Sequence, residues 1–254
     1  MKIVLITQNE PFYLAKNLDF LIKNVPINTK IVGCVLTEAS PFGKKETFYQ
    51  KSLKTFKVFG YQFFFYYAIK FLISKLDKKK SVKYVLKKHK IPIITLSSGI
   101  NEFDSVNKIK YYKPDLLISI LGNQIFKKQI FKLATHGCLN LHTAILPKYR
   151  GLMPTFWVLK NNEKYTGVSV FYVDDGIDSG PIIVQEKIEI GNKNQEQLIR
   201  ITKKIGMKCI LRAIELIRDN KVKLIKNDDS KKTYFSFPTR SDVSQFYKLN
   251  KKFF

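Results

Sequence analysis

The chain has 254 residues, of which 45% are hydrophobic and 26% are charged, and its formal net charge is +25. This composition excludes an intrinsically disordered chain, and the length suits one α/β domain with an appendage or two small domains. The charge alone would suit a nucleic acid or an anionic membrane, but only five of the 45 basic residues are arginines. Planar recognition of phosphates and bases favours arginine, which weakens the nucleic-acid interpretation.

Strand and helix patterns alternate through the first half of the chain. Apolar runs of the buried type predict strands over residues 2–6, 31–36, 91–96 and 115–121. Helical spacing of apolar residues predicts helices over residues 11–22, 82–89 and 105–112. This alternation predicts a Rossmann-like, doubly wound α/β fold with a mostly parallel sheet.

Shorter strands and one long helix follow in the second half. The pattern predicts a helix over residues 124–133 and strands over residues 137–142, 167–173 and 181–185. Asn194 and Gln197 form a capping-box pattern, after which apolar residues keep helical spacing as far as Leu216. This long helix is expected as a short C-terminal extension of the fold. The basic, aromatic tail 221–254 is expected to dock either on the domain or on a partner.

Residues 56–74 form the most apolar stretch of the chain and are rich in phenylalanine and tyrosine. Lysines interrupt the stretch, and crossing a membrane takes about 20 apolar residues, so we do not predict a transmembrane helix. We expect a buried aromatic helix here. An interfacial helix that rests on a membrane and a contact between subunits are the alternatives.

The N-terminus and the cysteines favour a cytoplasmic location. Residues 1–7 are too short for the apolar region of a signal peptide, and no cleavage-site pattern follows. The three cysteines are widely spaced and form no CxxC pair, which argues against a disulfide framework and a zinc site. Cys209 falls on the apolar face of the long helix and is expected in the core. The sequence also lacks the GxGxxG, P-loop, HExxH and GxSxG motifs.

Three types of polar residue gather around two predicted strands. Asn140 and His142 alternate with leucines, so both point to one face of the strand over residues 137–142. Asp178 lies in a glycine-flanked turn after the next strand, from which a carboxylate can reach back to an imidazole. An amide can stabilise an oxyanion, and an oriented histidine can transfer protons near neutral pH. Each residue alone is commonly structural, but the combination predicts acyl transfer through a tetrahedral intermediate.

The same stretch resembles the folate-dependent formyltransferases, which include methionyl-tRNA formyltransferase, glycinamide ribonucleotide transformylase and the sugar-nucleotide N-formyltransferases. The resemblance rests on Asn140-Leu141-His142, on Leu146-Pro147-Lys148-Tyr149-Arg150-Gly151, and on Asp178-Ser179-Gly180 before an apolar strand. It is strong over residues 113–190, weaker toward the N-terminus and absent over residues 50–80. It implies a catalytic domain over residues 1–192, with an insertion at about 50–80, and a C-terminal helix and tail over residues 193–254.

The resemblance also implies 10-formyltetrahydrofolate as the co-substrate and no metal. By the family's pattern, the pterin lies between the loop after residue 121 and the turn before Asp178, at Asn123, Gln124, Ile125, Phe126, Asp174 and Asp175. A further segment is expected to line the folate site, namely Ala144, Ile145, Leu146 and Pro147. The family often has serine where Ala144 stands, so the hydrogen bonds of that hydroxyl are missing here.

The implied reaction is attack of an acceptor amine on the formyl carbon. Asn140 and protonated His142 stabilise the oxyanion, and Asp178 sustains the histidine charge and helps to remove the amine proton. The acceptor is inferred by elimination. The 64 residues after Ile190 are too few for a helix and the tRNA-binding barrel of methionyl-tRNA formyltransferase. Glycinamide ribonucleotide transformylase lacks the run from Arg150 to Trp157.

By elimination, we expect a stand-alone enzyme that formylates the amine of a sugar nucleotide, in surface polysaccharide synthesis. A diphosphate-bearing acceptor suits the positive charge. Two alternatives stay open. One is an enzyme that acts on charged initiator tRNA, with steeply salt-dependent binding. The other is a non-enzymatic protein that binds an anionic surface or partner through residues 56–74.

Overall fold

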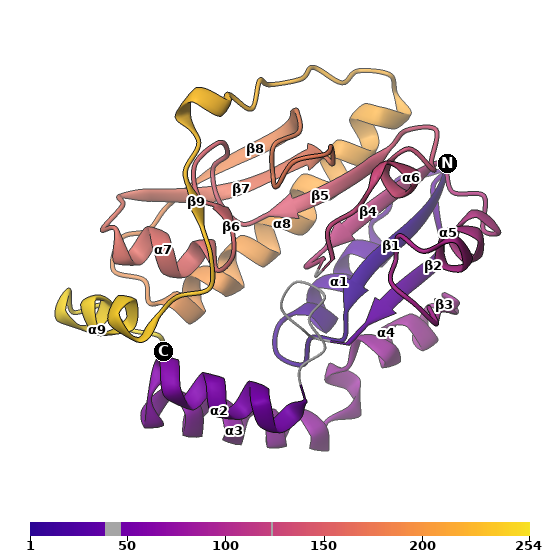
Figure 1. Ribbon diagram of the computed structural model, residues 1–254. Helices are drawn as coiled ribbons and strands as arrows, with labels where there is room; N and C mark the ends of the chain where they lie inside the picture. The colour runs from indigo at the N-terminus through magenta and orange to yellow at the C-terminus, as the bar shows by residue number, and fades with distance from the viewer. Residues whose placement is uncertain (39–46, 123) are drawn as a thin grey trace.

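The computed structural model describes residues 1–38, 47–122 and 124–254. Its centre is a seven-stranded sheet in the order β3-β2-β1-β4-β5-β7-β8 (Figure 1). The first five strands are parallel, and the last two are antiparallel to their neighbours. In sheet order their bounds are Ile93–Ile94, Lys30–Thr37, Lys2–Gln8, Leu116–Ile120, Cys138–His142, Tyr165–Tyr172 and Ile182–Glu189. The predicted fold class is confirmed.

Helices cover both faces of the sheet, which explains why the central strands are apolar on both sides. One hydrophobic cluster joins alternate residues of β1, β4 and β5 to α1 (Leu14–Lys23), α4 (Val82–Lys88) and α8 (Gln195–Arg218). The intervening residues of β1 and β4 form a second cluster with α5 (Phe103–Lys110) and α6 (Lys128–Phe131). The core therefore consists of two apolar layers with the sheet between them.

The chain changes winding direction between β1 and β4, because β2 and β3 lie on one side of β1 and the later strands lie on the other. Ligands of doubly wound folds bind beyond the carboxyl ends of strands at such a switch point. The two strand ends are joined here, since the Gln8 side chain donates a hydrogen bond to the Leu121 carbonyl. The loop after β4 therefore starts at a fixed position.

The long helix α8 begins as the sequence predicts. Asn194 accepts a hydrogen bond from the Gln197 backbone at 2.9 Å, and the Gln197 side chain accepts one from the Asn194 backbone. Cys209 is buried on the inner face of the helix. Gly206 lies against Leu141 of β5, where an added Cβ would come within 2.7 Å of a leucine methyl. Helix α8 thus packs closely under β5. The division of the chain at residue 192 remains a proposal.

The tail docks on the domain, which resolves one of the open alternatives. After the short helix η3 (Asp229–Lys231), β9 (Tyr234–Phe235) pairs in parallel with β6 (Arg150–Gly151). The last helix, α9 (Arg240–Lys248), packs against α7 (Pro154–Lys160). The aromatic rings of Phe156, Phe246 and Phe253 form the centre of this third cluster.

The prediction of a buried aromatic helix is wrong. The segment forms two helices, α2 (Phe48–Phe59) and α3 (Tyr61–Leu76), which are separated at Gly60, where φ is +84°. A short helix η2 (Lys78–Lys80) follows. None of the described residues of α3 is buried, because the hairpin lies outside the two layers that enclose the sheet (Figure 1). No helix in the described ranges is both long enough and apolar enough to cross a membrane.

Several other elements differ from the predicted lengths. The strand β3 has only two residues, and α6 has four residues instead of the ten in the predicted range. The strands β7 and β8 are longer than predicted and have eight residues each. The two strands pair with each other along most of their length, and both therefore continue past the apolar residues on which the prediction rests.

Candidate active site

Strand β5 presents two polar side chains on the face that points away from α8. Leu139 and Leu141 belong to the cluster that contains α8, so Asn140 and His142 face the other way. Across the sheet, Asn140 pairs with Phe171 and His142 pairs with Ser169 of β7. The alternation within β5 thus places the amide and the imidazole side by side.

The imidazole of His142 is held through both nitrogens. Its Nε2 lies 2.7 Å from the carbonyl oxygen of Tyr149, and a carbonyl only accepts, so Nε2 is the donor. Its Nδ1 lies 3.5 Å from Oδ2 of Asp178. Nδ1 is therefore the ring nitrogen that faces the carboxylate.

Asp178 is fixed at the tip of its turn. Its φ is +48°, which is the left-handed region that aspartate tolerates better than most residues. Its Oδ2 also accepts a hydrogen bond from the backbone N–H of Gly151 at 2.8 Å. Since Tyr149 holds the histidine and Gly151 holds the aspartate, the loop 149–151 sets the distance between the two side chains.

The carboxamide of Asn140 is free to meet a ligand. The side chain is half-buried, and no described residue forms a hydrogen bond with it. Polar groups in such an environment normally have a partner in the protein or the solvent. Its N–H groups are therefore open donors, two residues along the strand from His142. An amide, an imidazole and a carboxylate of this kind can stabilise an oxyanion and move a proton.

The tail supplies a residue that the sequence analysis missed. The Asn227 amide donates hydrogen bonds to the carbonyl oxygens of Asp178 and Gly180, both at 2.9 Å. Its Oδ1 accepts a hydrogen bond from Arg150 at 2.9 Å, and Asn227 is itself buried. Arg150 also pairs with Asp229 at 2.8 Å. No spacing pattern marks an asparagine within a charged tail, so sequence reasoning had no signal for it.

The same tail fixes the loop 149–151 from the other side. The Thr233 hydroxyl accepts a hydrogen bond from the Tyr149 N–H at 2.8 Å, and the Phe235 carbonyl accepts one from the Leu152 N–H at 2.8 Å. Gly151 has a φ of +94°, and a Cβ there would lie 2.3 Å from the Phe235 carbonyl oxygen. Only glycine fits so close to β9.

Burial, followed by a hydrogen bond to Glu163, raises the pKa of the Tyr149 phenol to about 12. The phenol donates to Glu163 at 2.7 Å, and its ring stacks on Phe235 with 5.3 Å between the ring centroids. Tyr149 therefore remains protonated near neutral pH. The contacts of its side chain fix the Tyr149 backbone carbonyl, which accepts the hydrogen bond from His142.

Two of the predicted folate loops contribute side chains to one hydrophobic cluster. Phe126, in the loop after β4, belongs to the same cluster as Val173, which directly precedes Asp174. Asn123 lies outside the described residues. Gln124 is engaged through its side chain, which accepts a hydrogen bond from the Ile100 N–H at 2.9 Å. Ile125 is exposed. The loop thus exposes one apolar side chain, that of Ile125.

The two acidic residues of the turn differ. Asp174 accepts hydrogen bonds from the Ser179 hydroxyl at 2.5 Å and from the Gly176 N–H at 3.1 Å, so it shapes the turn. Asp175 is exposed. Asp175 is therefore the one with its carboxylate turned to solvent.

The segment after β5 contributes mainly its backbone. Ala144 and Leu146 are buried in hydrophobic clusters, whereas Ile145 and Pro147 are half-buried. Ser169 donates to the Ala144 carbonyl at 2.7 Å and accepts from the Leu146 N–H at 3.2 Å. The neighbouring strand therefore supplies a hydroxyl that fixes this segment, although residue 144 has none.

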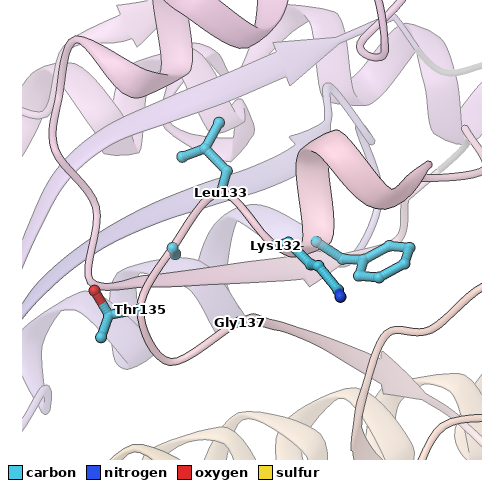
Figure 2. Close-up of a pocket in the computed structure, with 6 residues that line it drawn as sticks. Lys132, Leu133, Thr135 and Gly137 are labelled. Atoms are coloured by element: carbon cyan, nitrogen blue, oxygen red, sulfur yellow. The ribbon is translucent and has the colours of Figure 1, made fainter.

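Two pockets lie elsewhere. Figure 2 shows the first, which the loop before β5 forms with Lys132, Leu133, Thr135 and Gly137 among its lining residues. The second lies between β3 and the end of α5. Neither has a predicted site residue in its lining. Among the described residues, no group of three or more His, Cys, Asp or Glu side chains is arranged to hold a metal ion.

Comparisons with known proteins place the chain in a family. A family model described as formyl transferase matches residues 70–214. A methionyl-tRNA formyltransferase from Kosmotoga olearia is 34% identical over 187 residues, which are 70% of this chain and 60% of that protein. A second one, from Alkaliphilus oremlandii, is 35% identical over 153 residues, which are 60% of this chain and 49% of that protein. The chain thus spans about half to three-fifths of the length of these relatives.

Solved structures share the fold at low sequence identity. An N-formyltransferase from Helicobacter canadensis has a TM-score of 0.60 at 18% identity, with 98% of this chain and 80% of that chain covered. A phosphoribosylglycinamide formyltransferase from Anaplasma phagocytophilum has a TM-score of 0.62 at 16% identity, with 94% and 99% covered. Since the family model spans more than half of its residues, the chain belongs to the formyl transferase family.

Proposed function

We propose that this protein transfers a formyl group from 10-formyltetrahydrofolate to a primary amine. The observation that carries the proposal is the approach of His142 Nδ1 to the Asp178 carboxylate, at 3.5 Å, beside the open amide of Asn140. Membership of the formyl transferase family supports the reaction class.

Each of the three residues has a separate role in the proposed reaction. Asn140 donates a hydrogen bond to the formyl oxygen as it gains negative charge, and protonated His142 stabilises the same charge. Because Nε2 of His142 is engaged by Tyr149, the proton that the ring exchanges is the one on Nδ1. Asp178 keeps that proton in place and accepts the proton that the attacking amine loses. The bond between the formyl carbon and the donor nitrogen of the folate then breaks, and that nitrogen takes up the proton as tetrahydrofolate leaves. Either role is typically worth about 10²–10⁴ in rate.

The described residues fit a folate donor. A pterin needs an apolar contact and hydrogen-bonding groups, and the proposed site offers both. The exposed side chain of Ile125 and the free carboxylate of Asp175 stand on two loops, and both loops contribute a side chain, Phe126 and Val173, to one hydrophobic cluster. We propose that these loops and the backbone of residues 144–147 hold the pterin. When it is bound, the donor supplies the activated formyl group.

As acceptor we propose the amine of an amino-sugar nucleotide. The Helicobacter canadensis structure is described as a complex with folinic acid and dTDP-3-aminofucose, and its match extends over 98% of this chain. The docked tail supports this choice, because Asn227 and Thr233 complete the site from within the chain. A nucleoside diphosphate also complements the net charge of +25.

A second acceptor class, charged initiator tRNA, is favoured by a different observation. The relatives with the higher sequence identity, 34% and 35%, are methionyl-tRNA formyltransferases. If tRNA is the acceptor, the 40 lysines that accompany the five arginines give binding that weakens steeply with salt.

One experiment separates these acceptors. The protein is incubated with 10-formyltetrahydrofolate and with either a panel of amino-sugar nucleotides or methionine-charged initiator tRNA, and the products are analysed by mass spectrometry. A sugar nucleotide that gains one formyl group supports the first acceptor, and formylmethionyl-tRNA supports the second. If no amine gains a formyl group while the folate is bound, the proposed activity is wrong.

A further inference from the structure

The outward face of helix α3 is apolar along its whole length. Phe65 and Ile69 are each 58% exposed, Leu72 is 64% exposed and Leu76 is 86% exposed, and all lie on one side of the helix. Tyr61 and Ile73 continue the same row. A surface helix of a soluble domain normally turns its polar side outward. A contiguous apolar face of this size on the outside marks an interaction site.

Helix α2 extends this face. Tyr49, Leu53 and Phe56 recur at helical spacing and are exposed. Phe56 contacts Phe64, which contacts Phe65 in turn, with 5.6 Å between ring centroids in both pairs. The two helices therefore present one continuous surface, which we call the hairpin face.

The opposite side of α3 is the polar side, and it is packed against the domain. Lys70 pairs with Glu196 of α8 at 2.7 Å, and the Tyr66 hydroxyl donates to the same carboxylate at 2.8 Å. Phe63 stacks on Phe59 with 4.4 Å between the rings, and Tyr66 stacks on Phe254 at 3.9 Å. The hairpin is thus held with its ion pair inside and its aliphatic side chains outside.

Exposed lysines accompany the hairpin face. Residues 48–80 contain one acidic residue, Asp77, and eight lysines, of which Lys57, Lys75, Lys79 and Lys80 are exposed, whereas Lys70 is packed against the domain. Apolar and aromatic side chains flanked by lysines are the composition of helices that lie in the interface of an anionic bilayer. A second copy of the chain fits less well, because a symmetric contact would bring two lysine-rich rims together.

We propose that the hairpin face docks on an anionic lipid membrane, with Phe65, Ile69 and Leu72 inserted among the lipids and the lysines at the headgroups. The structure corrects which aromatic residues matter. Phe63 and Phe64 face other rings of the protein, so only Phe65 of the run 63–65 is available to lipid. This inference does not depend on the proposed formyl transfer.

The test is flotation of the full chain with vesicles of phosphatidylcholine and phosphatidylglycerol, and with vesicles of phosphatidylcholine alone. We expect binding to the mixed vesicles only, with partition reduced about tenfold by high salt. The variant Phe65→Ser/Ile69→Ser should bind roughly 100-fold more weakly, because it loses two inserted side chains. The matched control, Ile27→Ser/Phe103→Ser, removes two exposed apolar residues outside the hairpin and should bind like the wild type.

Circular dichroism and the unfolding midpoint show whether the variants fold. In each double serine variant both substituted side chains are more than half exposed, so we expect these variants to fold. A second charge-reversal variant, Lys75→Glu/Lys79→Glu, tests the rim without changing the apolar side chains, and it should also lose binding. The proposal is overturned if wild-type protein ignores the mixed vesicles, or if Phe65→Ser/Ile69→Ser binds them unchanged. A dimer in solution that this variant disrupts would overturn it in favour of self-association.

Discussion

The candidate active site and the α2–α3 hairpin differ in which side chains are buried and which are exposed to solvent. At the site, almost every polar group has a partner: His142 meets Tyr149 and Asp178, and Asn227 holds the Asp178 turn. On the hairpin, large apolar side chains such as Leu76 lie in solvent, and the ion pair of Lys70 lies inside. The contacts at the site therefore fix the positions of its side chains, whereas the hairpin exposes an apolar surface.

This contrast indicates where changes will act. Within the site, moving a group by a fraction of an ångström changes chemistry, because reacting groups tolerate little misplacement. On the hairpin, substitutions of exposed residues change the binding of the protein to other surfaces and leave the candidate active site unchanged. Variants in each region test this division.

The largest effect is expected at the site itself. Replacing His142 by glutamine, or Asn140 by alanine, should lower formyl transfer by about 10²–10⁴-fold, because each removes a group that stabilises the oxyanion. Steady-state rates measure the loss, and thermal unfolding shows that the fold persists. His136→Gln is the matched control, since His136 lies just before the other end of β5. Wild-type rates in either site variant would exclude that residue from the chemistry.

Asn227 should have a smaller but clear effect. The variant Asn227→Asp keeps the size of the side chain but loses the N–H groups that bind the Asp178 and Gly180 carbonyls. We expect kcat to fall about 10- to 100-fold with KM for the folate little changed, because Asp178 is misplaced rather than removed. Asn220→Asp, an exposed change in the turn after α8, is the control. Unchanged kcat in Asn227→Asp would mean that the tail does not position the aspartate.

Lys70, which holds the α2–α3 hairpin on the domain, should affect the stability of the protein but not its turnover. Lys70 donates to Glu196 and to the Tyr13 hydroxyl, both at 2.7 Å, and its side chain is 20% exposed. Replacing it by methionine should lower the free energy of unfolding by roughly 1–3 kcal/mol, since charged hydrogen bonds are lost. Urea denaturation measures this, and kcat should stay within about twofold of wild type. A large loss of kcat would mean that the hairpin and the candidate active site are coupled.

The smallest effect is a dependence on pH. Burial acts to raise the pKa of Glu196, but hydrogen bonds from Lys70, Arg200 and Tyr66 outweigh it, so the pKa lies below its ordinary value of 4.5. A carboxylate with a lowered pKa stabilises the fold above its unfolded value, and this stability is lost as the pH falls through the folded value. The gap in unfolding free energy between wild type and Glu196→Gln should therefore narrow below about pH 4.5. A gap that stays constant into stronger acid would contradict this account.

Much of the fold follows from local patterns in the sequence. The buried strands β1, β2, β4 and β5 and the capped helix α8 are predictable, because apolar runs and the Asn194–Gln197 box are local signals. The alternation of Asn140 and His142 with leucines likewise places both on one face. Asp178 follows only from the resemblance and from its glycine-flanked turn.

The remaining features depend on contacts between distant parts of the chain. Asn227 meets Asp178 across 49 residues, and β9 meets β6 across more than 80, so no spacing within a window reveals either contact. The aromatic segment misleads for a related reason. Its composition predicts burial, but whether a neighbour covers Phe65 and Ile69 depends on where the sheet layers end.

The most direct test of the central claim is the release of tetrahydrofolate from 10-formyltetrahydrofolate in the presence of the amine identified by mass spectrometry. The rate is measured for wild type, Asp178→Asn and the His136→Gln control at equal folate saturation. If the imidazole and carboxylate at the end of β5 perform the transfer, wild type and the control release product together, and Asp178→Asn is slower by at least about 100-fold. Equal rates for all three proteins would contradict the account, because the chemistry would then lie elsewhere in the chain.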